Sequence, residues 1–490
     1  DMYYKVQDFS FANIDKFSSA SIVTRLTSDV ANLQMAFQMC IRMAIRCPMM
    51  LILAMVSSLR ISPKLSSVYF VAIPILAVVL LGIVPLVFNI FDRVFKTYDR
   101  LNTVVQENVH GIRVVKSFVR EDKEVDKFTA ISQSIYRDFC KAEHILAVNN
   151  PVMQFCVYGC ILAISWIGAH LVVASGNNAN LGLTTGELSS MFTYTTQILT
   201  ALMMFSMVFV MTIMARSPLR RCYEILVEEP SLASPENALK EVADGSIDFD
   251  HVSFRYSAKA KRPALQDVEL HIPAGSTVGI LGATGSSKST LVQLIPRLYD
   301  ATEGTVKVGG RDVRDYDLEV LRDNVAMVLQ KNTLFSGSIK ENLRWGNASA
   351  TDEELVHACQ LACADDFIRS FPDGYDTHIE QGGTNVSGGQ KQRLCIARAL
   401  LKKPKILILD DSTSAVDTHT DAMIRKAFKE EIPGTTKLII AQRISSIQDS
   451  DIILVMENGH VACVGNHERL MKESDFYRGI YESQQKGSED

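Results

Sequence analysis

Three long stretches without a charged residue limit what the N-terminal half of this chain can fold into. They cover residues 68–91, 145–175 and 188–215. A helix needs about 20 predominantly apolar residues, at a rise of roughly 1.5 Å per residue, to cross the hydrocarbon core of a bilayer. Each stretch meets that length, so we predict membrane-spanning helices in this half of the chain.

A fourth stretch, residues 47–59, is shorter and extends backward only through Arg42 and Arg46. We count it as a fourth span, covering about residues 36–59, because long basic side chains near one end of a span reach the membrane interface. The alternative is a buried helix of a soluble core, which three stronger neighbouring spans disfavour. Residues 1–222 are therefore expected to form a transmembrane domain in a lipid membrane.

Positive charge sets the orientation of these spans. Residues 92–144 carry ten Lys or Arg, whereas residues 176–187 carry none. The positive-inside rule places residues 92–144, and everything after the last span, in the cytosol. The short turn before residue 68 holds two basic residues and lies outside, as a small exception.

Two segments on the cytosolic side have apolar residues at helical spacing among charges, residues 92–144 and residues 14–34. We expect each segment to form a helical hairpin. In the segment 14–34, Ser18 or Ser19 is expected to cap a helix. The hairpins either extend into solvent beyond the spans, or their tips contact the soluble half of the protein.

The last span carries four methionines on one helical face, Met203, Met207, Met211 and Met214. Methionine suits a wall for varied apolar ligands, but ordinary helix packing explains the stripe slightly better. The lack of charge in the three long spans disfavours a pathway for metal ions or strongly ionic solutes. A neutral or amphipathic small molecule is the favoured cargo.

The C-terminal half is typical of a soluble α/β protein. Residues 223–245 are acidic, contain two prolines and are predicted to be a linker. The net charge of −5 argues against nucleic acid as a main partner. The cysteines form no metal-ligand array, and the pairs Cys156/Cys160 and Cys359/Cys363 are better explained as buried free thiols.

Residues 276–295 (STVGILGATGSSKSTLVQLI) comprise an apolar strand, a glycine-bearing loop and the start of a helix. This is the context that a phosphate-binding loop requires. Gly282 and Gly285 allow the backbone to turn its N–H groups toward phosphate oxygens. Lys288 would reach the β- and γ-phosphates, and the Ser289 hydroxyl would bind Mg²⁺.

Ser287 departs from this pattern, which places glycine at that position. A side chain there crowds the phosphate cradle or forces a costlier backbone angle, so we expect weakened rather than abolished nucleotide binding. Downstream, residues 404–417 form a second apolar run that ends in acids. Asp410 falls at the carboxyl end of that run, where α/β sheets place their ligands.

Between these two strands lies the run VSGGQ, residues 386–390, which matches the signature motif of ATP-binding cassette (ABC) proteins. The match covers nearly all of residues 246–483. Together with the spans, the chain resembles an ABC exporter in which the membrane and nucleotide-binding domains are fused. The resemblance implies an all-α transmembrane domain followed by an α/β P-loop NTPase domain with a helical subdomain, and a polar tail at residues 484–490.

The resemblance also assigns roles to single residues. Tyr256 would stack on adenine, Gln330 would touch Mg²⁺ and sense the membrane domain, and Asp417 would communicate across a dimer. The hairpin tips would be the coupling helices of the family. The implied ATP-binding residues are Tyr256, Gly282, Thr284, Gly285, Ser286, Ser287, Lys288, Ser289, Thr290, Gln330 and Asp410; Ser289, Gln330 and Asp410 would bind Mg²⁺, and the partner's ATP would meet Val386, Ser387, Gly388, Gly389 and Gln390.

Two further departures fall at catalytic positions. The family usually has glutamate after Asp410, as the base that polarises the attacking water; here it is Asp411, which is one methylene shorter. Gln442 stands where the family places a histidine that contacts the γ-phosphate, and glutamine carries no positive charge near neutral pH. In this family two chains pair, and the signature of each chain completes the ATP site of the other. The residues that serve this chain's own ATP site are therefore altered, whereas the signature that serves the partner's site is unchanged.

This asymmetry is similar to the weaker half of bacterial heterodimeric multidrug-type ABC exporters. It implies a second half-transporter as partner, slow hydrolysis at the chain's own site, and a place in the bacterial plasma membrane with the nucleotide-binding domain in the cytosol. The family has six spans per half, so the first two are expected to be absent from this sequence. The alternatives are an ATP-gated regulatory subunit without productive hydrolysis and a non-functional fragment.

Overall fold

The computed structural model describes residues 1–178, 182–257, 260–411 and 416–486. The chain divides into two compact units. One unit is essentially Ala20–Val227, and the other combines Tyr3–Ser19 with Glu228–Asp490. The predicted order of a helical domain followed by an α/β domain is confirmed.

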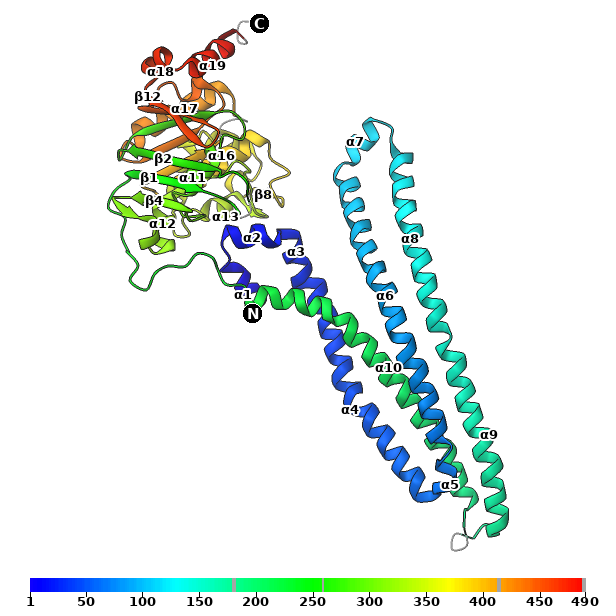
Figure 1. The fold of residues 1–490 in the computed structure, drawn as a ribbon. Helices are drawn as coiled ribbons and strands as arrows, with labels where there is room; N and C mark the ends of the chain where they lie inside the picture. Colours follow the sequence, from blue (N-terminus) through cyan, green and yellow to red (C-terminus); the bar gives the residue numbers. More distant parts are fainter. Residues whose placement is uncertain (179–181, 258–259, 412–415, 487–490) are drawn as a thin grey trace. The chain divides into compact units, whose positions relative to one another are not determined.

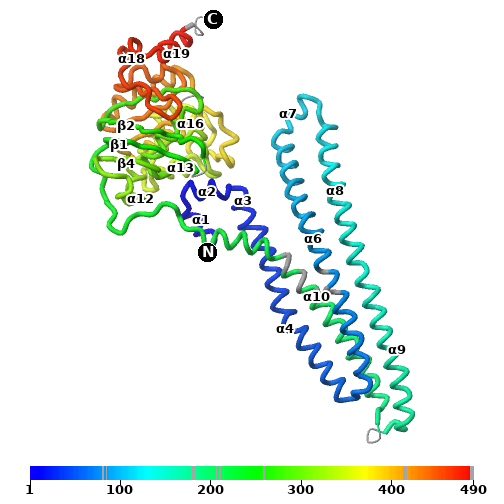
Figure 2. Tube along the Cα trace, viewed as in Figure 1, coloured from blue at the N-terminus to red at the C-terminus, as the bar shows by residue number. Residues whose placement is uncertain are grey.

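The helical unit consists of long antiparallel helices, in which α10 runs along α4 and α6 runs along α8 (Figure 1). Prolines occur inside three of these helices, which membrane helices tolerate because neighbouring groups satisfy the freed backbone. Figure 2 shows α6 and α8 meeting at the short helix α7. The helices are α3 (Ser19–Thr24), the π-helical turn η1 (Arg25–Asp29), α4 (Val30–Ile61), α5 (Pro63–Ser66), α6 (Tyr69–His110), α7 (Ile112–Ser117), α8 (Glu121–Ala147), α9 (Asn149–Ser175) and α10 (Thr185–Val227).

All four stretches predicted to be membrane spans are helical apart from the turn residues Val68 and Val148, the latter between α8 and α9. Within the described residues, two helical segments are long and apolar enough by composition to cross a bilayer, Ser19–Ile61 and Glu121–Ser175. Tyr69 is fully buried in the core of the unit, and its hydroxyl lies 2.8 Å from Thr195 Oγ1. The cytosolic hairpin predicted over residues 92–144 is held by buried Val94, Val104, Ile131 and Ile135 of α6 and α8.

The second unit contains a six-stranded sheet in the order β12-β11-β3-β10-β9-β6, beside a four-stranded antiparallel sheet in the order β2-β1-β4-β5. Strand β9 is buried along its whole length, as an apolar run inside a parallel sheet requires. Two apolar cores contribute to the packing of this unit, and each includes residues of β9 and β10. The strands are β1 (Ile247–Phe254), β2 (Leu265–Ile272), β3 (Thr277–Gly282), β4 (Glu303–Val308), β5 (Arg311–Asp312), β6 (Val325–Val328), β7 (Gly337–Ser338), β8 (His378–Ile379), β9 (Ile406–Asp410), β10 (Thr436–Ile440), β11 (Ile452–Glu457) and β12 (His460–Gly465).

The helices of the second unit are interspersed with the strands along the chain. All ten cysteines are free; Cys156, Cys160 and Cys359 are buried as predicted, whereas Cys363 is only half-buried. The helices are α1 (Met2–Gln7), α2 (Phe11–Phe17), α11 (Lys288–Gln293), α12 (Leu318–Asn324), α13 (Ile339–Arg344), α14 (Asp352–Leu361), α15 (Asp365–Ser370), α16 (Gly388–Leu400), α17 (Thr418–Glu431), α18 (His467–Glu473) and α19 (Asp475–Lys486).

The expected helix cap near the first hairpin tip lies elsewhere. Ser10 caps α2, with its hydroxyl accepting from the Asn13 backbone N–H at 3.3 Å and the Asn13 side chain accepting from the Ser10 N–H at 3.2 Å. Ser18 has φ 57° and ends α2, and Ser19 is already the first residue of α3. The run of serines in the sequence concealed this break between two helices.

Candidate functional site

The parallel strands of the six-stranded sheet bring the predicted site residues to one edge. Ile440 of β10 pairs with Ile280 of β3 on one side and with Asp410 of β9 on the other. The carboxyl ends of these strands therefore meet, which is where ligands bind in open α/β sheets. The phosphate loop follows β3, Asp411 follows β9 and Gln442 follows β10. Gln330 is exposed after β6, the neighbour of β9.

The phosphate loop has the backbone that its glycines were expected to provide. Gly285 has φ 84°, and an added Cβ there would meet no atom within 4 Å, so open space lies above it. Thr284 is exposed beside it. Gly282 is tightly confined, because an added Cβ would lie 2.4 Å from the Met456 carbonyl oxygen.

Ser287 adopts the left-handed conformation, with φ 71° and ψ 26°. This conformation costs a non-glycine residue roughly 1–2 kcal/mol. The strain that the sequence predicted at this position is therefore present in the fold, at the residue directly before α11.

Replacing Ser287 by glycine will relieve this strain. We expect the free energy of unfolding to rise by about 1 kcal/mol and ATP to bind about fivefold more tightly, because the loop is freed of the hydroxymethyl group. Isothermal titration with a non-hydrolysable ATP analogue measures the affinity. Lys403→Gly is a matched control, since Lys403 also has positive φ (49°) but lies outside the phosphate loop. Tighter binding in both variants, or in neither, would contradict the prediction.

Lys288 and Ser289, the residues predicted to contact phosphate and Mg²⁺, both make hydrogen bonds at this edge of the sheet. The Lys288 ammonium donates to the Gly282 and Ala283 carbonyls at 2.8 and 2.9 Å. Burial lowers the pKa of Lys288, against the opposing carboxylates of Asp411 and Asp410. The Ser289 hydroxyl donates to Asp410 Oδ1 at 2.9 Å.

Asp410 is almost fully buried, with 3% of its surface exposed. Burial raises the pKa of its carboxyl above the ordinary value; the Ser289 hydroxyl opposes this shift and the Asp411 charge adds to it. An ionised Asp410 therefore destabilises the folded chain, a cost that begins as the pH rises above the unfolded pKa of about 3.9.

Asp410→Asn will consequently raise the thermal unfolding midpoint of the nucleotide-free protein at neutral pH, and the gain will disappear below about pH 4, where both states are protonated. Calorimetry across pH measures it. Asp417→Asn provides the opposite sign, because the Thr420 N–H bonds to Asp417 and lowers its pKa, so that the ionised form stabilises the fold. A loss of stability in the Asp410 variant at neutral pH would disprove this account.

The two departures from the family pattern contact each other. The Gln442 side-chain amide donates to Asp411 Oδ2 at 2.9 Å. Asp411 has φ 50°, so the backbone turns sharply directly after β9. The Gln442 amide is thus hydrogen-bonded to a carboxylate that is one methylene shorter than a glutamate.

Tyr256 presents an exposed aromatic ring beside the loop, with 53% of its surface accessible. Its hydroxyl lies 2.9 Å from Thr290 Oγ1, at the start of α11. The ring also packs edge-on against Tyr299 at a centroid distance of 5.2 Å. Tyr299 in turn donates to Asp15 Oδ2 of α2 at 2.7 Å. The sequence did not single out Tyr299, which joins the expected adenine platform to the first hairpin tip.

The signature segment is exposed at Ser387 and Gly388 and forms the start of α16. The Ser387 hydroxyl accepts from the Gln390 backbone N–H at 3.2 Å, and the Gln390 side chain accepts from the Ser387 N–H at 2.9 Å. Val386 is half-buried and anchors the segment against the core. The signature is thus a preformed helix start with two exposed residues, Ser387 and Gly388.

The C-terminal helix also reaches the site. Gln484 of α19 donates to the Gln442 carbonyl at 2.8 Å and accepts from the Ile444 N–H at 2.9 Å. The first residues of the expected polar tail, up to Lys486, are therefore helical. Only the amphipathic pattern of residues 475–486 could have indicated this contact.

The residues present fit ATP and Mg²⁺. The Ser286 hydroxyl is buried within the loop without a hydrogen-bond partner in the described part of the chain, and the crest around Gly285 is open. Ser289 and Asp410 supply hard oxygen donors of the type that Mg²⁺ prefers. The described residues contain no cluster of three or more metal-ligating side chains.

Comparisons with known proteins cover both halves of the chain. A family model described as the ABC transporter matches residues 265–414, and one described as the ABC transporter transmembrane region matches residues 1–213. The uncharacterized ABC transporter ATP-binding protein YfiB of Bacillus subtilis (strain 168) is 38% identical over 490 residues, covering 100% of this chain and 84% of that protein. The uncharacterized ABC transporter ATP-binding protein Rv1273c of Mycobacterium tuberculosis is 33% identical and is covered to 82%.

Among solved structures, a bacterial Atm1-family ABC exporter with ATP bound is similar in fold. The TM-score is 0.84 at 25% sequence identity, and the match covers 99% of this chain and 83% of that one.

Proposed function

As a member of the ABC transporter family, this chain is a multi-pass membrane ATPase of the exporter type with a cytosolic nucleotide-binding domain, and we propose that it forms the half of a heterodimeric exporter that carries the slower ATP site. The partner is a second half-transporter with an intact base and histidine. The cargo is an amphipathic or drug-like molecule that leaves through the paired membrane domains. The four helical stretches assigned as spans would line that path.

The observation that carries this proposal is the 2.9 Å hydrogen bond between Gln442 and Asp411. A general base must approach within about 3.2 Å of the proton that it takes, and its help is worth roughly 10²–10⁴ in rate. A retreat of about 1 Å can cost on the order of 10². Asp411 is shorter than glutamate and its oxygen already accepts the Gln442 amide, which supports slow hydrolysis at this site.

Nucleotide binding itself is supported by the rest of the site. The exposed Tyr256 ring offers a stacking platform, and Lys288 with the loop N–H groups offers positive charge for phosphates. Ser289, Gln330 and Asp410 would hold Mg²⁺, which supplies neutralisation of phosphate charge when bound. The chain's signature, Ser387 to Gln390, would complete the ATP site of the partner. Asp417 caps α17 next to the altered site and is the proposed contact across the dimer.

The proposal is tested by measuring ATP hydrolysis of the purified chain alone, of a candidate partner alone and of their mixture in lipid. We expect brisk hydrolysis only in the mixture. Brisk hydrolysis by the isolated chain, paired with itself, would contradict a heterodimer with one slow site.

A regulatory subunit, in which ATP gates the membrane domain without productive hydrolysis, is favoured by the same three altered positions, Ser287, Asp411 and Gln442. It predicts a different outcome of the same experiment: ATP binds to this chain, and the mixture remains inert.

A further inference from the structure

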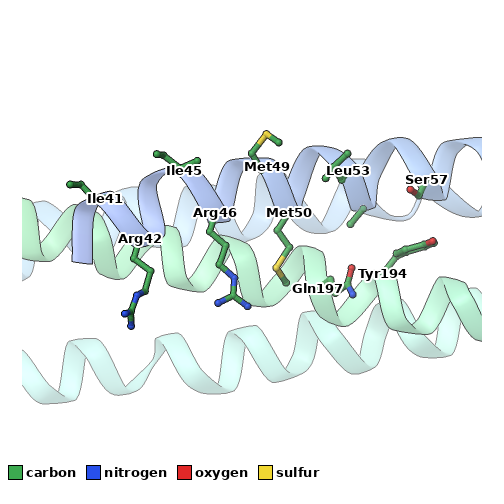
Figure 3. Close-up of a pocket in the computed structure, with 11 residues that line it drawn as sticks. Ile41, Arg42, Ile45, Arg46, Met49, Met50, Leu53, Ser57, Tyr194 and Gln197 are labelled. Atoms are coloured by element: carbon green, nitrogen blue, oxygen red, sulfur yellow. The ribbon is translucent and has the colours of Figure 1, made fainter. Parts of the chain in front are cut away.

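Two arginines are the only charged residues in the predicted fourth span, residues 36–59. Arg42 and Arg46 are separated by about one turn of α4, so their side chains leave the same face of the helix. Figure 3 shows both side chains extending from the same side of α4. Both are exposed, and neither has a hydrogen bond or an ion pair to any residue in the described ranges.

The spans of this chain supply no charge to pair with these arginines. Residues 30–61, 68–91, 145–175 and 188–215 contain no Asp or Glu. Long basic side chains near the end of a span extend toward the membrane interface, and ionisable residues in spans face a protein interior or a cavity, where they pair with an opposite charge. A negative charge that pairs with Arg42 and Arg46 would therefore have to come from outside these segments.

The arginines line a cavity of about 570 Å³ between α4 and α10. This volume lies within the range of small-molecule sites, roughly 300–1,000 Å³. Met49, Met50 and Leu53 continue the α4 wall beyond the charges, and Tyr194 and Gln197 contribute polar groups from α10 (Figure 3). The cavity thus has a positive end and an apolar end, roughly 18 Å apart from Arg42 to Ala54 along the helix.

We propose that this cavity binds an anionic amphiphile from the cytosolic leaflet, with its carboxylate or phosphate at Arg42 and Arg46 and its hydrocarbon chain along Met50 and Leu53. The inference rests on the proposed exporter function and narrows its cargo from amphipathic molecules to anionic ones. The positive-inside orientation supports it, because it puts the arginines toward the cytosolic end of α4. An amphiphile of the inner leaflet has the same polarity, with its head toward the cytosol and its tail toward the bilayer centre.

The test uses the complex of this chain with its partner in phosphatidylcholine nanodiscs, without nucleotide. Laurate, dodecanol and dodecylamine have the same hydrocarbon tail and differ in head charge. Their binding is measured by titration calorimetry in the wild type and in Arg42→Gln/Arg46→Gln. We expect the wild type to prefer laurate over dodecanol by at least about tenfold, the value of a charge-assisted hydrogen bond, and the double variant to bind the two alike.

Two matched variants distinguish the effect of the positive charge on laurate binding from a general loss of structure. Arg42→Lys/Arg46→Lys keeps the charge and should keep the preference for laurate. Arg60→Gln removes an exposed arginine from the end of the same helix, outside the cavity lining, and should change nothing. A preference for laurate that survives in the glutamine variant would overturn the proposal.

Two other sources of negative charge give different results, and either would also overturn the proposal. If bulk lipid pairs with the arginines, phosphatidylglycerol will stabilise the complex in an arginine-dependent way while laurate shows no saturable binding. If an acid of the partner pairs with them, the glutamine variant will separate from the partner and the wild type will not prefer laurate. ATP hydrolysis by the complex without any of the three probes tests the exporter proposal separately, because it does not depend on which negative charge pairs with the arginines.

Discussion

Replacing Ser387 by alanine will lower ATP hydrolysis of the paired complex by about 10²-fold or more, although Ser387 lies in the subunit whose own site is slow. The Ser387 hydroxyl is exposed at the start of α16, and the first N–H groups of that helix point the same way. Removal of one preorganised donor to a developing charge costs roughly 10²–10³ in rate. Steady-state hydrolysis by the reconstituted complex measures the effect.

The control for this prediction is a serine in the same local structure. Ser338 caps α13 through the same reciprocal pair of hydrogen bonds, with Glu341 in the place of Gln390. Ser338→Ala removes a cap worth roughly 1 kcal/mol but faces no proposed nucleotide. If both alanine variants reduce hydrolysis to the same extent, loss of the helix cap explains the effect and the signature is not lent to a partner.

Local patterns in the sequence predicted much of the fold because the physics behind them is local. A strand, a glycine loop and a helix start in direct succession set the course of residues 276–295, and the strain at Ser287 followed from one missing glycine. Helix length and the absence of charge located α6, α9 and α10, and α4 was found although it contains Arg42 and Arg46. Ligands bind at the carboxyl ends of parallel strands. This rule predicted that Asp410 and the phosphate loop lie close together, although the sequence shows no direct contact between them.

Contacts between distant segments were not predictable in the same way. Tyr299 contacts Tyr256 and bonds to Asp15, which is 284 positions away from it, and Gln484 of the last helix bonds to Gln442. Single polar residues in such places carry no periodic signal. Arg42 and Arg46 were visible in the sequence, but their cavity depends on how α10 packs along α4, which hydrophobic patterning leaves open.

The altered residues of this chain's own ATP site allow us to predict substitutions that speed up ATP hydrolysis there. Asp411→Glu together with Gln442→His will raise hydrolysis at this site by about 10²-fold, because the carboxylate gains one methylene of reach and the group at position 442 can carry positive charge. Asp411→Glu alone will gain less, since the Gln442 amide still holds the carboxylate. Ser287 remains unchanged, so the gain appears in turnover more than in affinity.

The measurement must isolate hydrolysis at the ATP site formed by this chain's own phosphate loop, called here the home site. Ser387→Ala does this, because it removes the signature serine that this chain contributes to the partner's ATP site. In that background, residual hydrolysis by the complex reports the home site, whose signature comes from the partner. Lys288→Ala added to the same variant should abolish the gain, because it removes the phosphate-facing charge without changing the base. If the double substitution leaves turnover unchanged while ATP still binds, the shortened carboxylate and the neutral amide are not what slows this site, and the proposed division of labour between the two subunits fails.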